Sequence, residues 1–200
     1  MTAKPNPTLR GALGRAILIV ALANLAYFGV EFTVALRIES ASLLADAADF
    51  LEDAAVNLLI LLGLGWSARN RARLGRLLAL VLLAPALAFL WTLWRKLQAP
   101  VVPAADLLSL TGLGALAVNL SCAFLLARYR NHEGGLTRAA FLSARNDAIA
   151  NVGIILAGGV TLLTRSLWPD VLVGGAIAWM NIDAAREVLA AARGESDPQP

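Results

Sequence analysis

The 200-residue sequence contains little charge: Asp, Glu, Lys and Arg make up 16% of it, whereas an average soluble domain carries about 25%. It has one cysteine, so no internal disulfide can form and a disulfide-stabilised scaffold is excluded. The shortage of charge also excludes a large soluble enzyme domain and a nucleic-acid-binding domain. Whatever the protein does is therefore expected to take place in its apolar segments.

Apolar residues make up 58% of the chain and occur in runs of about twenty, long enough for a helix to cross a hydrocarbon core of about 30 Å. The sequence therefore predicts an all-α membrane protein, a six-transmembrane-helix bundle over residues 11–193. A cytoplasmic tail (1–10) precedes the bundle and a flexible tail (194–200) follows it. The predicted spans are 11–36, 42–66, 77–94, 104–127, 139–163 and 168–192.

The basic residues indicate how the bundle is oriented. Twelve Lys and Arg residues fall on one side of the predicted spans and four on the other. Because positively charged loops stay in the cytoplasm, we expect a multi-pass protein of the cell membrane with both termini cytoplasmic. The same loops explain the net charge of +3, so the expected partner is the lipid bilayer and not nucleic acid. No prosthetic group is expected.

The predicted second span carries four carboxyl groups within eight residues: Asp46, Asp49, Glu52 and Asp53. One such group at the centre of a span costs about 2.5–3.5 kcal/mol, so the four must face a protein interior or water. At 100° per residue, Asp46, Asp49 and Asp53 lie in one stripe that Asn57 extends, with Glu52 at its edge. Carboxylates one turn apart can converge on one divalent cation.

The predicted fifth span carries a matching stripe, in which Ser143, Asp147 and Asn151 follow one another at intervals of four residues. Together the two helices predict a metal site built from Asp49, Asp53, Asp147 and Ser143. Three carboxylates outweigh a doubly charged ion, so an empty site would hold protons that metal binding expels. Polar residues expected around the site or along a proton path are Asp46, Glu52, Asn57, Asn151, Asn146, Glu31, Asn24 and Arg145.

The two acidic spans also share a short sequence pattern. Both contain Asp-Ala-x-x-Asn, beginning at Asp53 and at Asp147, and each is preceded at nearly the same distance by an asparagine, Asn24 or Asn119. The pattern predicts two three-helix repeats, inverted in the membrane because each has an odd number of helices. Helices two and five would then line the site between the repeats.

These residues resemble the cation diffusion facilitator (cation efflux) family of six-helix divalent-metal/proton antiporters. The resemblance lies in Ser-Ala-Ser-Leu-Leu-Ala-Asp-Ala at 40–47, in Asp49-x-x-x-Asp53, and in Asp-Ala-x-x-Asn-Val-Gly at 147–153. It implies that Asp49, Asp53 and Asp147 bind zinc or a similar ion, and that Ser143 stands where the family has histidine.

The resemblance also implies a branch of the family. The chain looks like the short, transmembrane-only branch that lacks the C-terminal cytosolic domain. Because that domain usually mediates dimerisation, the sequence leaves open whether a homodimer forms. The expected function is export of a divalent metal cation from the cytoplasm in exchange for protons, without enzymatic activity.

Arg145 leaves alternatives open. It lies about 200° around the helix from Asp147, and its expected partner is Glu52 or Asp46. If it faced the site instead, the protein would be a non-transporting membrane sensor or assembly protein with a degenerate metal site. A proton or monovalent-cation channel is another alternative. An intramembrane enzyme is disfavoured because Ser143 has no histidine nearby to activate it.

Overall fold

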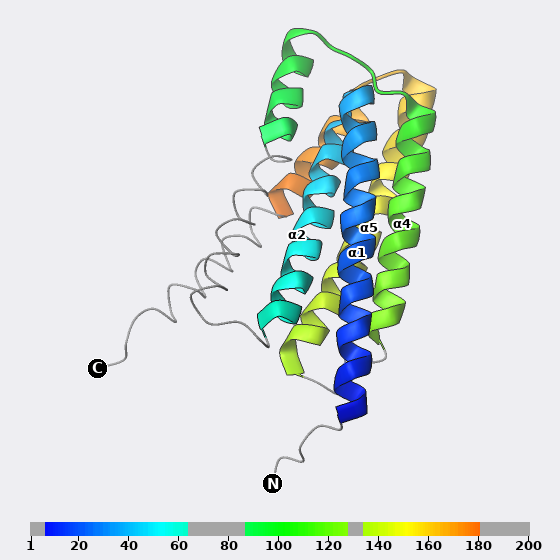
Figure 1. Ribbon diagram of the computed structural model, residues 1–200. Coiled ribbons are helices and arrows are strands. Elements are labelled where there is room, and N and C mark those ends of the chain that lie inside the picture. Colours follow the sequence, from blue (N-terminus) through cyan, green and yellow to red (C-terminus); the bar gives the residue numbers. More distant parts are fainter. Residues whose placement is uncertain (1–6, 64–86, 128–133, 181–200) are drawn as a thin grey trace, which may run out of the picture.

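The computed structural model of the chain describes residues 7–63, 87–127 and 134–180, and in these ranges it contains helices and no strand (Figure 1). The labelled helices are α1 (Pro7–Ile38), α2 (Ala41–Gly63), α4 (Ala105–Ala127) and α5 (Gly134–Thr164). Two further helical segments cover residues 87–98 and 168–180. The predicted all-α class is confirmed, whereas the inverted repeat stays a prediction.

Three segments are long and apolar enough to cross a membrane among the residues described: Gly11–Ile38, Ala105–Ala127 and Ala144–Thr164. The helix α2 has 23 residues, enough to span, but its four carboxyl groups set it apart from these three. Its acids must be shielded by neighbouring helices, because lipid cannot solvate them.

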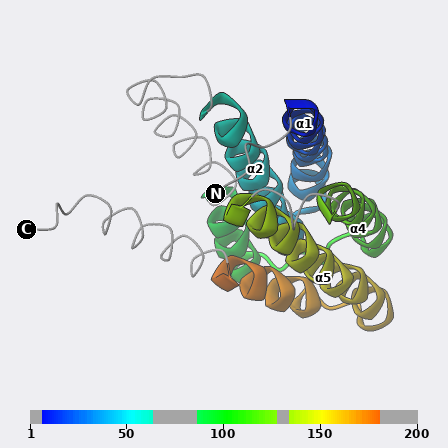
Figure 2. The same cartoon turned by 90° about the horizontal axis from the view of Figure 1, so that it is seen from below.

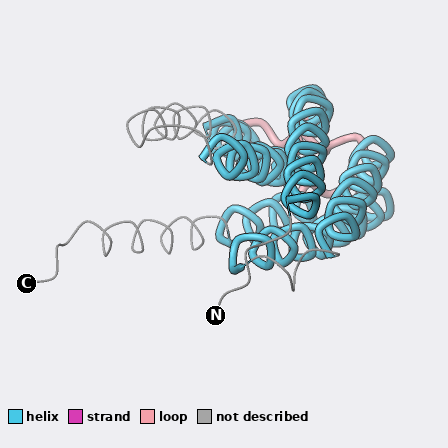
Figure 3. Tube along the Cα trace, turned by 60° about the horizontal axis from the view of Figure 1, so that its bottom comes forward, coloured by secondary structure: helices cyan, strands magenta, loops and turns pink. Residues whose placement is uncertain are grey.

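The helices pack in a bundle in which α1 lies against α2 and α4, α4 lies along α5, and α2 contacts α5. Figure 2 shows α5 crossing the bundle obliquely, and the loops that Figure 3 draws between described helices are short. One apolar cluster joins all six helical segments through buried residues such as Ile38, Leu44, Phe89, Leu108, Ile154 and Ile177. This packing brings α2 and α5, which carry the acidic stripes, side by side.

The helix limits differ from the predicted spans in several places. The third span is predicted to end at Trp94, next to Arg95 and Lys96, and the helix of residues 87–98 continues past these basic residues. The helix α5 begins at Gly134, five residues earlier than predicted. The tails at 1–6 and 194–200, the arginine-rich loop, and the remaining parts of the third and sixth spans lie outside the described residues.

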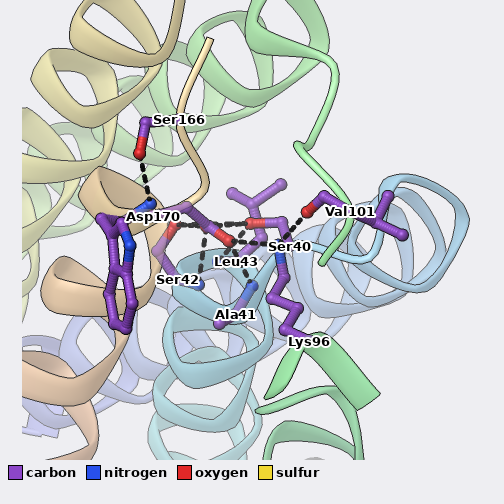
Figure 4. A network of polar contacts seen from close by, with 9 residues as sticks. Ser40, Ala41, Ser42, Leu43, Lys96, Val101, Ser166 and Asp170 are labelled. Carbon is purple, nitrogen blue, oxygen red and sulfur yellow. Dashed lines mark hydrogen bonds and ion pairs between the residues drawn. The ribbon is translucent and has the colours of Figure 1, made fainter. Parts of the chain in front are cut away.

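The carboxylate of Asp170 caps the first turn of α2, at one end of the bundle (Figure 4). It accepts hydrogen bonds from the Ser40 hydroxyl at 2.6 Å, from the Ala41 and Ser42 N–H groups at 2.9 and 3.0 Å, and from the Ser42 hydroxyl at 2.7 Å. Lys96 Nζ lies 3.2 Å away, and both side chains of this ion pair are buried. A negative charge here satisfies the free N–H groups of the first turn and complements the helix dipole.

Close backbone packing accompanies this network. A Cβ atom on Gly174 would lie 2.7 Å from the carbonyl carbon of Ala41 and from the nitrogen of Ser42. Glycine therefore lets segment 168–180 approach the first turn of α2 closely enough for Asp170 to reach it. The backbone reverses between α1 and α2 at Glu39, whose φ of 53° is left-handed.

Candidate metal centre

The two acidic stripes meet between α2 and α5. The negative charge of Asp147 on α5 acts on Asp49 across the helix contact, together with the charges of Asp46, Glu52 and Asp53 on α2 itself. Asp49, Glu52, Asp53 and Asp147 are all half-buried. Three of the four predicted ligands, Asp49, Asp53 and Asp147, are thus close enough for their charges to interact. All three stay partly exposed.

Asp53 is held in place by neutral amides. Asn24 on α1 points its Nδ2 at Asp53 Oδ2, 3.5 Å away, and the Oδ1 atom of Asn24 lies 3.9 Å from the Cys122 thiol on α4. Asn57 donates from Nδ2 to the backbone carbonyl of Asp53 at 2.8 Å, within its own helix. Asn24 therefore supports the Asp53 carboxylate without adding charge, whereas the bond from Asn57 goes to the Asp53 backbone.

The other predicted neighbours on α5 lie elsewhere. Ser143 is one turn before Asp147 in the same helix, but its side chain lies outside the described part of the structure, so its role as a ligand stays a prediction. Arg145 and Asn146 are exposed, and Arg145 Nη2 donates to Asn146 Oδ1 at 3.3 Å. Arg145 thus bonds to Asn146 and not, as expected, to Glu52 or Asp46, because its side chain is exposed whereas Asp46 is buried and Glu52 is half-buried.

A second acidic group lies one turn from Asp49 along α2. Asp46 and Glu31, from α1, are both 0% exposed and interact with each other. Asn151 Nδ2 donates to Asp46 Oδ2, and Asn119 Nδ2 donates to Asn151 Oδ1 at 2.9 Å. Asn151 therefore belongs to this buried group and not to the half-buried acids around Asp49.

The sequence did not reveal two parts of this arrangement. The pairing of Glu31 with Asp46 depends on the packing of α1 against α2, which neither helix's periodicity specifies. The buried ion pair of Asp170 with Lys96 was also missed. Its only signals were an acid directly after Pro169, at the start of a helix, and the two serines that flank Ala41.

The half-buried acids do not form a finished metal site. In the described ranges, no three His, Cys, Asp or Glu side chains are gathered closely enough to hold a metal ion. Carboxylates that repel one another across two helices nevertheless attract a cation, which would reduce that repulsion. The arrangement can therefore concentrate cations between α2 and α5.

Comparison with known proteins supports a role in cation transport. Residues 17–193 match the family described as the cation efflux transmembrane domain, a range that includes both acidic stripes. A search of curated proteins returned no match. Since the match covers most of the sequence, the chain belongs to the cation efflux family and is a multi-pass membrane protein that transports cations.

Proposed function

We propose that this transporter moves a divalent metal cation, zinc or a similar ion, out of the cytoplasm in exchange for protons. The metal would bind at Asp49, Asp53, Asp147 and Ser143. The observation that carries the proposal is the electrostatic interaction of Asp49 on α2 with Asp147 on α5, both half-buried, in a chain of the cation efflux family.

The charge of the three carboxylates explains why metal would be exchanged for protons. Three carboxylates carry more negative charge than one divalent cation can balance, so in the absence of metal some of them hold protons. Metal ligands must be deprotonated, and binding therefore releases protons on the side from which the metal enters. With Ser143 in place of histidine the site loses a nitrogen ligand, which shifts its preference toward harder ions or weakens metal binding.

The position of the acids on two different helices suggests how access could alternate. Movement of α2 and α5 around a central site would expose the site to one side of the membrane and then the other, as is common in transporters.

The test is metal flux into proteoliposomes with an imposed pH gradient, measured for zinc, manganese, iron, cobalt and cadmium. Asp53→Ala should abolish pH-driven flux of the transported ion. The matched control is Asp106→Ala, which removes an exposed carboxylate from the first turn of α4. Equal flux through the wild type and Asp53→Ala for every ion would overturn the proposal.

The alternative of a non-transporting sensor or assembly protein relied on Arg145 neutralising a degenerate site. Arg145 is exposed and bonds to Asn146, which leaves that alternative without its neutralising cation. The sensor or assembly-protein alternative predicts that calorimetry detects no metal binding. It also predicts that Arg145→Ala destabilises the protein more than Asp53→Ala. Our proposal predicts that calorimetry detects metal binding and that Arg145→Ala, which alters an exposed side chain, changes stability little.

A further inference from the structure

Glu31 and Asp46 form the most deeply buried acidic pair that the structure describes. Both are 0% exposed, and both carboxylate oxygens of Glu31 and the Oδ1 atom of Asp46 are buried without a hydrogen-bond partner. The ion pairs between described residues join Arg95 to Glu39 and Lys96 to Asp170, so neither neutralises this pair. Three unpartnered oxygens of two acids therefore lie together in the protein interior.

The amide chain on the other side of Asp46 distinguishes its two oxygens. Asn119 Nδ2 donates to Asn151 Oδ1, so the Nδ2 of Asn151 is directed at Asp46, where it donates to Oδ2. This leaves Oδ1 of Asp46 as the oxygen available to Glu31. A proton on either carboxyl group would convert one of these unpartnered oxygens into a donor and another into its acceptor.

The groups around the pair carry no positive charge among the residues described. Tyr27 on α1 and Asp49 on α2 are the titratable neighbours that act on it, whereas α4 and α5 contribute the neutral Asn119 and Asn151. Two adjacent carboxylates in a medium of low polarity cannot both stay ionised without a cation. A shared proton lowers the charge of the pair from −2 to −1 and supplies the missing hydrogen bond.

We propose that Glu31 and Asp46 form a proton-binding site, separate from the metal centre, that holds one proton between the two carboxyl groups. Its use in exchange rests on the proposed function. Asp49 repels negative charge on Glu31, and its own carboxylate is repelled by Asp46. A cation bound at Asp49 weakens that repulsion and lowers the cost of the −2 form of the pair, so the proton leaves as the metal enters.

The proton itself can be detected without transport. Infrared difference spectra of the metal-free protein in H₂O and D₂O should contain, beside any bands from protonated acids of the metal centre, the C=O band of the shared proton of Glu31 and Asp46 at neutral pH. Glu31→Gln and Asp46→Asn should each remove the shared-proton band while the protein elutes as the wild type does on size exclusion. The matched control Glu52→Gln, which alters a half-buried acid of α2, should keep it. Absence of the band from the wild type, or its survival in both Glu31→Gln and Asp46→Asn, would overturn the proton site.

Coupling is tested by protons released per metal ion bound, measured with a pH-sensitive dye. Glu31→Gln should release about one proton fewer than the wild type. An unchanged ratio in this variant would refute the coupling. Displacement of the band by Na⁺ alone would refute a proton-specific site, because the pair would then bind a monovalent cation.

The two proposals can fail separately. If Asp53→Ala transports metal as the wild type does, the proposed function fails, but a band that depends on Glu31 and Asp46 still establishes the proton site. If Asp53→Ala abolishes transport and Glu31→Gln leaves both the band and the proton ratio unchanged, the metal centre stands and the proton site fails.

Discussion

Removal of Asp170 should destabilise the bundle more than removal of its ionic partner. Asp170→Ala leaves the Lys96 ammonium buried with one remaining acceptor, the Val101 carbonyl at 3.0 Å. It also removes the acceptor for two hydroxyl and two N–H donors at the start of α2. Lys96→Met, in contrast, leaves the Asp170 carboxylate with all four of those donors.

The structure gives the size of the difference. Breaking a buried ion pair by deleting one partner costs about 3–5 kcal/mol when the other charge stays without compensation, and we expect this range for Asp170→Ala. For Lys96→Met the loss is that of one charged hydrogen bond, about 1.5–3 kcal/mol, since four donors still solvate the carboxylate. The neighbouring Arg95–Glu39 pair is partly exposed, so Arg95→Met should cost less than about 1 kcal/mol.

The assay is unfolding in mixed micelles by increasing SDS fraction, followed by tryptophan fluorescence, for the wild type and these three variants. The expected order of destabilisation is Asp170→Ala, then Lys96→Met, then Arg95→Met. A loss in Lys96→Met equal to that in Asp170→Ala would show that the ion pair and not the helix cap provides the stability. A loss in Arg95→Met equal to that in Lys96→Met would refute the role assigned to burial.

Three further predictions concern packing and the metal centre. Gly174→Ala should destabilise the protein by about 1–3 kcal/mol in the same unfolding assay, because its Cβ would meet the backbone of α2, whereas Gly175→Ala, with open space around it, should not. Asn24→Ala removes the amide beside Asp53 and should weaken metal binding by about tenfold in calorimetry, and unchanged affinity would contradict that supporting role. Ser143→His should raise affinity for zinc relative to manganese by restoring a nitrogen ligand, and an unchanged ratio would place Ser143 outside the site.

Sequence patterns predict most of the helices because each depends on local composition. Apolar runs and the prolines at 100 and 103 place α4 within one residue of its observed start, and the acidic stripe singles out α2. The proximity of Asp49 to Asp147 was predictable as well, since both stripes need shelter from lipid and the two helices that carry them can shelter each other.

Pairings that depend on how helices cross were not predictable. The sequence shows that Glu31 and Asp46 lie in apolar segments, but the turn at Glu39 and the contact of α1 with α2 decide that they meet. Asn119 and Asn24 occupy matching places in the sequence pattern, yet Asn24 contacts Asp53 while Asn119 bonds to Asn151. The periodicity of a helix shows which of its residues share a face. Which residue of another helix each of them contacts depends on how the helices pack.

The capping of α2 by Asp170 has a consequence for how the protein is made. The residue that completes the first turn of α2 follows Ser40 by 130 positions, so it is synthesised after four of the other helical segments. During insertion α2 enters the membrane with four acids and an unfinished first turn. Until the helix that begins near Trp168 is in place, the hydroxyl and N–H donors at the start of α2 lack the acceptor that Asp170 provides.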